Sequence, residues 1–320
     1  ERDDIDVVDI VTPGDTHAPI ALAALAAGKH VLCEKPLANS VAEAEEMAAA
    51  AEAARGRGVR SMVGFSYRRV PAVALMRDMI AEGVIGEIRH VRGQYLQDWI
   101  VDPEFPLVWR LRKEVAGSGA LGDIGAHVLD LAEFVTGQRI VGLAAQTETF
   151  VRQRPLQTGS GALGAATGDT SAEMGEVTVD DAAVLIARTD GGALGTFEAS
   201  RFATGRKNHI VLEVNGSLGS LEFRFEDMNA LRHHDASDGD RAGFARIDVT
   251  EPGHPYVGAW WPPGHGLGYE HTFVNQARDF LDAIATGTDP RPSFADGAAI
   301  QRLLAAVERS ADSDAAWTQV

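Results

Sequence analysis

The first 65 residues alternate short apolar runs with alanine-rich stretches, and this alternation limits the possible folds more than any other feature of the chain. The apolar runs lie at residues 5–11, 30–33 and 59–65, and the alanine-rich stretches at residues 17–28 and 40–55. Short runs rich in Val and Ile predict strands, whereas the stretches between them predict helices, the second of them capped by Ser40. Strands that alternate with helices and are apolar on both faces indicate a buried parallel sheet, so this region is predicted to be α/β.

From residue 88 onward the pattern changes to longer strands with alternating apolar residues. The predicted strands are residues 88–96, 142–151, 177–187, 192–202, 210–215 and 220–226. Turn sequences such as Asn215-Gly216 separate them, as in antiparallel hairpins. Further helices are predicted at residues 72–82, from the glycine-rich stretch 117–125 to about 135, at 270–286 and at 294–310, and a mobile excursion at residues 157–172.

These patterns predict an α/β plus α+β chain of two domains. Residues 1–86 form a parallel, doubly wound domain, and residues 87–320 form a domain with a large, mostly antiparallel open sheet. The two terminal helices are expected to pack back on the first domain. Because one face of an open sheet needs cover, its apolar positions predict a homodimer or homotetramer. Such positions are Val184, Ile186, Leu194 and Phe197.

Charge and cysteine content exclude several classes of function. The chain has 29 basic and 46 acidic residues and a net charge of −17, which argues against a nucleic-acid or anionic-membrane partner. No run approaches the roughly 18 apolar residues of a membrane span. The single cysteine, Cys33, excludes an internal disulfide framework and a cysteine-built zinc site. We therefore expect a cytoplasmic protein.

Polar segments follow each of the three predicted parallel strands, at residues 12–17, 34–36 and 66–69. The carboxyl ends of parallel strands meet at one edge of a sheet, where ligands bind. Lys35 matters most, because an ammonium group directly after a buried strand lies beside this crevice. A solvated lysine paired with Glu34 is the alternative that spacing alone leaves open.

A second candidate constellation follows the glycine-rich stretch. Asp123 and His127 are four residues apart, which places them on one face of a helix. A carboxylate beside an imidazole can hold one tautomer and tune it for proton transfer near neutral pH. A purely structural role for Asp123, as a helix cap, remains the alternative.

Other motifs favour no further chemistry. His233-His234-Asp235 is predicted to lie in a polar loop, and no spacing typical of a metal site occurs, so we expect solvated histidines and no metal. The Gly-Ser-Gly segments lack the spacing of a nucleophile elbow. The pair Trp260-Trp261 suits either the face of a sugar ring or a core or subunit contact.

Taken in order, these segments resemble the Gfo/Idh/MocA family of NAD(P)-dependent oxidoreductases. The matching stretches are residues 6–13 with His17, residues 28–31 leading into Glu34-Lys35-Pro36, residues 65–69, Trp109-Arg110, and residues 122–127 with Asp130. Each motif is weak alone, but the ordered set is specific and covers essentially the whole chain. The resemblance implies a partial Rossmann domain followed by a substrate domain, and it favours functional roles for Lys35, Asp123 and His127.

The resemblance also implies a reaction, a hydride transfer between a secondary hydroxyl of a sugar, anhydrosugar or inositol and NAD, with NADP not excluded. Lys35 would hydrogen-bond the reacting hydroxyl, His127 would act as the base, and Asp123 would orient His127 and contact the substrate. The implied cofactor-lining residues are Thr12, Pro13, His17, Glu34, Lys35, Arg68, Trp109 and Arg110. The implied substrate residues are Lys35, Asp123 and His127, joined by the candidates Asn208, Tyr256 and His265.

Two alternatives use the same residues. In an NAD-dependent glycoside-cleaving enzyme, a transient keto-sugar would permit elimination, and a non-catalytic nucleotide or sugar sensor would need no reaction at all. Retention of Lys35, Asp123 and His127 together disfavours the sensor.

The sequence departs from the family in one respect, because no G-x-G-x-x-G follows a first strand. In the family's fold, this loop and the helix after it form the main binding site for the cofactor's pyrophosphate. We therefore expect an N-terminally incomplete copy of the enzyme.

Overall fold

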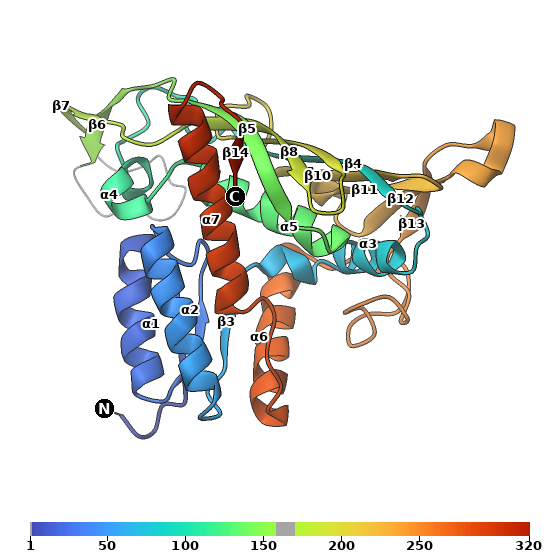
Figure 1. Ribbon diagram of the computed structural model, residues 1–320, viewed down its shortest axis with the longest axis horizontal. Coiled ribbons are helices and arrows are strands. Elements are labelled where there is room, and N and C mark those ends of the chain that lie inside the picture. Colours follow the sequence, from blue (N-terminus) through green and yellow to red (C-terminus); the bar gives the residue numbers. More distant parts are fainter. Residues whose placement is uncertain (1, 158–169) are drawn as a thin grey trace.

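The computed structural model describes residues 2–157 and 170–320, and within them the strands form a three-stranded sheet, a nine-stranded sheet and a separate hairpin. The smaller one, here called the parallel sheet, has the order β1-β2-β3 with both pairs parallel. Its strands are β1 (Val7–Ile10), β2 (His30–Cys33) and β3 (Ser61–Val63). The helices α1 (His17–Ala26) and α2 (Val41–Arg55) connect these strands and lie side by side (Figure 1). The predicted parallel α/β unit is confirmed.

The larger one, here called the large sheet, has the order β13-β12-β11-β10-β4-β9-β8-β5-β14. Its neighbouring strands in the described structure are antiparallel except for the parallel pair β4–β9. The strand bounds are β4 (Ile88–Leu96), β5 (Ile140–Glu148), β8 (Ala182–Thr189), β9 (Leu194–Ser200), β10 (His209–Gly216), β11 (Gly219–Arg224), β12 (Ala230–Asp235), β13 (Ala245–Asp248) and β14 (Thr318–Gln319). The hairpin pairs β6 (Gln153–Gln157) with β7 (Thr170–Glu176).

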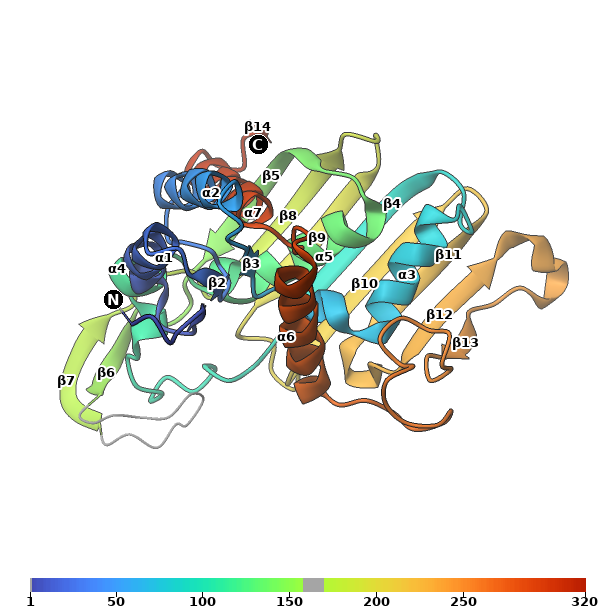
Figure 2. The same ribbon diagram turned by 90° about the horizontal axis from the view of Figure 1, so that it is seen from below.

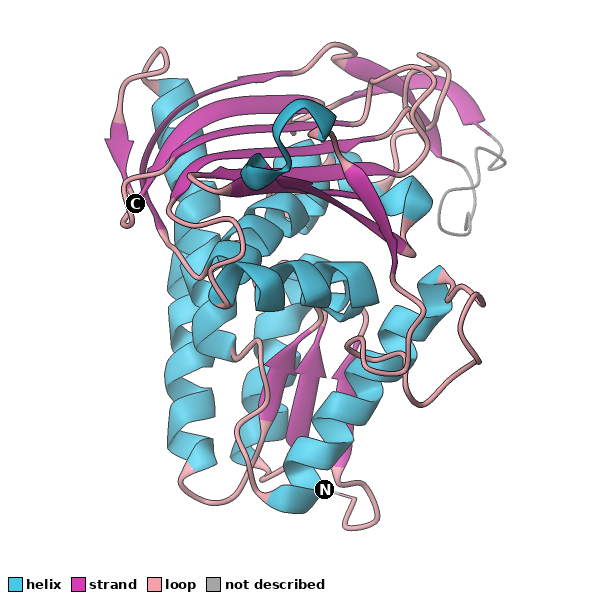
Figure 3. Cartoon of the chain, turned by 90° about the vertical axis from the view of Figure 1, so that its right-hand side faces the viewer, coloured by secondary structure: helices cyan, strands magenta, loops and turns pink. Residues whose placement is uncertain are grey.

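Helices occupy the space between the two sheets (Figure 3). On the large sheet, α3 (Pro71–Ala81) packs on β11 and β12, and α5 (Ala126–Thr136) packs on β4 and β10 (Figure 2). Near the C-terminus, α7 (Phe294–Asp312) contacts both α2 and β5 and so links the two sheets, while α6 (Tyr269–Thr286) packs on η2. The short helices are α4 (Lys113–Ala116), η1 (Gly14–Thr16), η2 (Ser66–Arg69), η3 (Trp109–Leu111), η4 (Leu121–Gly125), η5 (Phe225–Asp227) and η6 (Ala236–Arg241).

Local sequence explains where the longest helices begin. The Ser40 hydroxyl accepts a hydrogen bond from the Glu43 N–H at 3.2 Å and caps α2, as predicted. Ser293 and Asp296 form a reciprocal capping box at the start of α7. The apolar faces of these helices join one continuous core that includes residues of both sheets.

Two predicted elements differ from the structure. The predicted strand 177–187 is interrupted, because Asp180 and Asp181 use their carboxylates to bind backbone N–H groups of other segments, and β8 begins only at Ala182. His233 and His234 lie on strand β12 and not in a loop, so their side chains point to opposite faces of the sheet. Of the predicted excursion 157–172, residues 158–169 lie outside the described residues.

Candidate active site

Lys35 and Asp123 meet where the two sheets approach each other. Lys35 follows β2, so its side chain extends from the carboxyl end of the parallel sheet. Its Nζ donates to the backbone carbonyl of Asp123 at 2.6 Å and lies 3.4 Å from the Asp123 Oδ1. The Lys35 side chain is 15% exposed, so this charge is largely removed from water. The fold therefore brings together two predicted catalytic residues that are 88 positions apart in sequence.

Asp123 is an ionised carboxylate in a mostly desolvated place. Burial alone would raise the pKa of Asp123, but the positive charges of Lys35, Arg201 and Arg110 outweigh it and hold that pKa below the ordinary value. Arg201 is the nearest guanidinium, with its Nη1 3.7 Å from the Asp123 Oδ2. The site thus carries excess positive charge, which suits the stabilisation of an oxyanion.

Asp123 and His127, predicted to lie on one helix face, share no hydrogen bond among the described residues. Asp123 lies in η4, a π-helical turn that precedes α5, and in such a turn hydrogen bonds span five residues instead of four. Two residues four positions apart therefore no longer stack on one helix face. The Asp123 carboxylate contacts Lys35 and Arg201 instead, and its role in orienting His127 stays a prediction.

His127 lies near the start of α5 within an aromatic pocket. The ring centroids of Phe65, Tyr67 and Tyr95 lie 6.0, 4.7 and 6.0 Å from the imidazole centroid. Burial, assisted by the charge of Lys35, holds the pKa of His127 well below its ordinary value, so the ring is neutral at pH 7. Its Nδ1 is buried and has no hydrogen-bond partner among the described residues. A neutral imidazole with an unused nitrogen is a competent proton acceptor.

Hydrogen-bonded polar groups connect these aromatic rings to the large sheet. The Tyr67 and Tyr95 hydroxyls are 2.8 Å apart, and the Tyr95 hydroxyl donates to the Asn208 Oδ1 at 2.7 Å. Gln97 donates to the same oxygen at 3.0 Å. The structure thus brings the candidate Asn208 next to Tyr67 and Tyr95, whose rings lie against His127. Tyr95 and Gln97 were missed, whereas Tyr67 lies in the polar segment 66–69 that was noted after the third predicted strand but was given no role of its own.

The residues predicted to line the cofactor at the ends of β1 and β2 divide into two groups. Thr12 and Pro13 lie at the accessible edge, and Glu34, whose pKa is raised by burial, accepts a hydrogen bond from the Lys35 N–H at 3.2 Å. His17 is buried, and its ring nitrogens face the carbonyls of Thr12 and Pro36 at 2.9 and 3.0 Å. His17 therefore ties together the two loops of the crevice and has no nitrogen left for a ligand.

Arg68 and the pair Trp109-Arg110 also lie in different surroundings. Arg68 is bound to Asp130 through two hydrogen bonds, one of them at 2.8 Å, so its guanidinium is committed inside the protein. Arg110 lies over the Trp109 ring at 4.1 Å and belongs to the charges that act on Asp123. Trp109 and Arg110 therefore remain candidates for ligand contact.

The last predicted substrate candidates point elsewhere. The Tyr256 hydroxyl donates to Asp279 on α6 at 2.9 Å, and the exposed His265 contacts the carbonyl of Pro262 at 2.9 Å. Of the tryptophan pair, Trp260 packs edge-on against His271 on α6, whereas Trp261 is exposed. None of these contacts involves the cluster around His127.

Comparison with known proteins agrees with this geometry. Residues 1–65 match the family model described as the oxidoreductase family with an NAD-binding Rossmann fold, and residues 73–222 match the GFO/IDH/MocA C-terminal domain. The chain is 45% identical to levoglucosan dehydrogenase of Pseudarthrobacter phenanthrenivorans over 320 residues, which are 99% of this chain and 80% of that protein. The chain belongs to the Gfo/Idh/MocA family.

Solved structures of the family have the same fold. An oxidoreductase domain protein from Kribbella flavida is 62% identical, with a TM-score of 0.93 over 100% of this chain and 81% of that one. A levoglucosan dehydrogenase in complex with NADH and levoglucosan is 43% identical, with a TM-score of 0.90 over 99% of this chain and 81% of that one. The predictions of a Gfo/Idh/MocA fold and of an NAD-dependent oxidoreductase are thereby confirmed.

Proposed function

We propose that this protein oxidises a secondary hydroxyl of an anhydrosugar or sugar, with levoglucosan as the first substrate to test. The observation that carries the proposal is the largely buried group of Lys35, Asp123 and His127, in which the Lys35 ammonium is held on Asp123 and its charge acts on a neutral imidazole. The aromatic rings and hydroxyls of Tyr67 and Tyr95 suit a substrate with C–H faces and several hydroxyl groups. Similarity to levoglucosan dehydrogenase supports this substrate class.

The residues divide the chemistry between them. Lys35 donates a hydrogen bond to the reacting hydroxyl and stabilises the negative charge that develops on its oxygen. His127 accepts the hydroxyl proton, which its lowered pKa permits at neutral pH. Asp123 remains ionised, holds the Lys35 ammonium through its backbone carbonyl and carboxylate, and so fixes the direction of the donor.

The edge of the parallel sheet fits a nicotinamide cofactor. The carboxyl ends of β1, β2 and β3 bring Thr12, Glu34 and Ser66 to one edge, which is where dinucleotides bind in such sheets. Together with Lys35, Trp109 and Arg110, these segments would hold NAD. When bound, NAD supplies the hydride acceptor.

The test is a hydride-transfer assay with levoglucosan and NAD on the wild type and on the variants Lys35→Met and His127→Asn. We expect both variants to lose about 100-fold or more in kcat, since each removes one group that acts in the transition state. Lys113→Met is the matched control, because this lysine pairs with Glu308 at the surface. Equal rates in wild type and both variants would refute the assignment.

Product analysis separates the alternative reactions of the same residues. A keto-sugar with one NADH per turnover supports the dehydrogenase. Release of free aglycone from a glycoside without net NADH would instead show the glycoside-cleaving cycle. Saturable binding of NAD or sugar without turnover would show a sensor.

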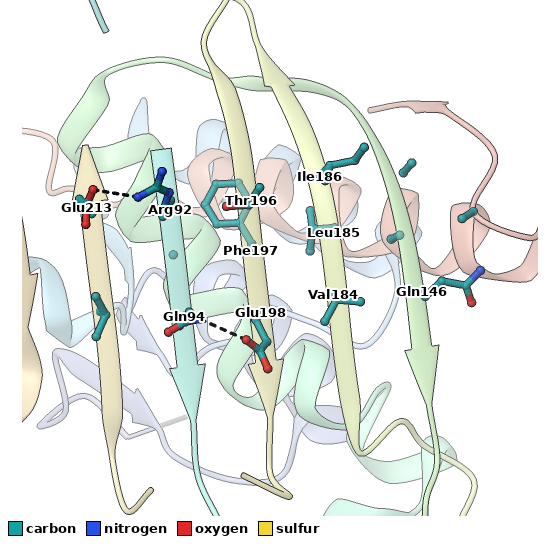
Figure 4. Close-up of a pocket in the computed structure, with 15 residues that line it drawn as sticks. Arg92, Gln94, Gln146, Val184, Leu185, Ile186, Thr196, Phe197, Glu198 and Glu213 are labelled. Atoms are coloured by element: carbon teal, nitrogen blue, oxygen red, sulfur yellow. Dashed lines mark hydrogen bonds and ion pairs between the residues drawn. The ribbon is translucent and has the colours of Figure 1, made fainter. Parts of the chain in front are cut away.

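We further propose that the protein forms a homodimer or homotetramer through the outer face of the large sheet. A hollow of about 550 Å³ lies on this face (Figure 4), and the apolar side chains of Val184, Ile186 and Leu194 are 49, 51 and 42% exposed there. The ion pair Arg92–Glu213, also on this face, places both charges on one patch, as a self-complementary contact requires. Phe197 points to the opposite face and packs near α5.

Light scattering tests this assembly. We expect an oligomer for the wild type and a smaller species for Ile186→Glu. Leu281→Glu is the control, because Leu281 is 56% exposed on α6, away from this face. A monomeric wild type would contradict the proposal.

The described helices include none with the length and apolar character to cross a membrane. A reducing compartment such as the cytoplasm stays our proposal, supported by the lone buried Cys33.

A further inference from the structure

A buried arginine lies behind the catalytic carboxylate. Arg201 directly follows β9 and is completely buried, with its guanidinium 5.5 Å from the centre of the Trp99 ring. Its Nη1 lies 3.7 Å from the Asp123 Oδ2, and its Nη2 donates to the carbonyl of Asp180 at 3.0 Å. Its Nε and Nη1 have no hydrogen-bond partner among the described residues. Burying a guanidinium with unpaired N–H groups is costly, so its place next to Asp123 calls for a reason other than stability.

Arg201 is joined to the turn that carries Asp123. The Asp180 carbonyl that receives Arg201 also accepts the Ala120 N–H at 3.0 Å, and the Asp180 carboxylate accepts the N–H groups of Gly119 and Leu121 at 2.7 and 2.8 Å. A Cβ on Gly119 would lie 1.7 Å from the Asp180 carbonyl oxygen and 2.8 Å from the Arg201 Nη2. The backbone just before Asp123 therefore packs directly against Arg201 and Asp180.

We propose that Arg201 is a positioning residue for the reaction, one that fixes Asp123 as an ionised carboxylate aimed at Lys35. The proposal rests on the proposed function, because Asp123 matters to catalysis through its hold on Lys35. Arg201 lies nearest to one oxygen of the Asp123 carboxylate, Oδ2, whereas Lys35 lies nearest to the other, Oδ1. It has no need to touch the substrate.

Arg201 differs from the other charged groups near Asp123 in its complete burial. Within the described chain, the ionisable groups that interact electrostatically with Asp123 include Lys35 after β2, Arg110 on η3, Arg201 after β9, and the phenols Tyr67 and Tyr95. Lys35 and Arg110 are partly exposed, and both are candidates for ligand contact. Arg201 is the completely buried cation of this set, so its charge is the least screened by water. Its loss is expected to raise the pKa of Asp123, because burial then meets less opposition.

The first experiment compares Arg201→Met and Arg201→Lys by the pH dependence of kcat/KM. We expect Arg201→Met to lower kcat about 10- to 100-fold, to leave KM for NAD within about 3-fold, and to move the acid limb to higher pH. Arg201→Lys is expected to restore most of the rate, because it keeps the charge. Arg154→Met is the control, since Arg154 is equally buried but binds backbone carbonyls, including that of Ile100. An acid limb shifted equally by Arg154→Met, or by neither variant, would overturn the proposal.

The second experiment needs no activity and so separates this proposal from the proposed function. Urea unfolding of wild type, Arg201→Met, Asp123→Asn and the double variant forms a double-mutant cycle. We expect strong coupling, since the double variant removes both members of a buried ion pair and should be no less stable than Arg201→Met alone. Additive effects would refute the pairing even if the enzyme acts on levoglucosan. If Arg201→Met does not fold, Arg201→Gln takes its place in the cycle, because it also removes the positive charge. Inactivity of the wild type would refute the proposed function and leave the cycle valid.

Discussion

Replacing Asp130 with Asn is expected to destabilise the protein severely, because it leaves Arg68 buried without its anion. Arg68 and Asp130 are joined by two hydrogen bonds, and their side chains are 11% and 1% exposed. The guanidinium also lies over the Phe134 ring at 4.8 Å, which offers no hydrogen-bond acceptor to replace the carboxylate. Breaking a buried ion pair of this kind costs about 3–5 kcal/mol.

Urea unfolding measures this cost. With a slope of roughly 3 kcal/mol per M, the expected loss corresponds to a fall in the midpoint of about 1–1.5 M for Asp130→Asn. The double variant Arg68→Met/Asp130→Leu replaces both charges by apolar groups of similar size and is expected to cost much less. A single variant within about 1 kcal/mol of wild type, or a double variant as unstable as the single one, would refute this reasoning.

The same double variant tests the cofactor role that the family resemblance implies for Arg68. If Arg68 serves the fold alone, the stable double variant keeps its KM for NAD. If Arg68 also contacts the cofactor, the KM for NAD rises although stability is retained. The structure favours the first outcome, because the Arg68 guanidinium is bound to Asp130.

Further variants probe the helix cap and the turn next to the site. Burial opposes ionisation of Asp296, but hydrogen bonds led by the Ser293 N–H hold its pKa at about 2. A carboxyl group whose pKa is lower in the folded than in the unfolded state stabilises the fold above pH ~4. Asp296→Asn is therefore expected to cost about 2 kcal/mol of unfolding free energy at pH 7. In urea titrations this cost should fade as the pH falls from ~4 to 2. Gly119→Ala is expected to destabilise by at least 1–3 kcal/mol and abolish turnover, because its Cβ would lie 1.7 Å from the Asp180 carbonyl. Gly243→Ala, in open space, should unfold within about 0.5 kcal/mol of wild type, and an equal loss in both would contradict the argument.

Local patterns were sufficient where a residue's role depends on its immediate neighbours. The helices α2, α6 and α7 begin within one residue of the predicted positions, because capping residues and apolar periodicity are encoded locally. The strands of the parallel sheet were found for a similar reason, since short apolar runs between helices have few alternatives. Predictions were less accurate where a side chain binds the backbone of a segment far away in sequence. Asp180 and Asp181 do so, and they interrupt the predicted strand 177–187.

The site shows the same division. Lys35, Asp123 and His127 were singled out because each occupies a position with a recognisable local context, a strand end or the start of a helix. Arg201, Tyr95 and Gln97 lie in or directly after long strands, where residues of one face cannot be told apart until the partners across the sheet are known. The π turn was also invisible, because no local residue pattern separates it from an α-helical turn, and it redirects Asp123 from His127 to Lys35 and Arg201.

The sequence by itself determined most of the strands and helices, the two kinds of sheet, the family and the three residues of the proposed site. These depend on periodicity, caps and residue types, all of which act over a few positions. Only the tertiary structure decided which charges share a buried space. Arg68 is bound to Asp130, His17 contacts the carbonyls of two loops, and Arg201 lies beside the Asp123 carboxylate. The physical reason is that desolvation and Coulomb interactions depend on distances between segments far apart in the chain, which only the packed fold sets.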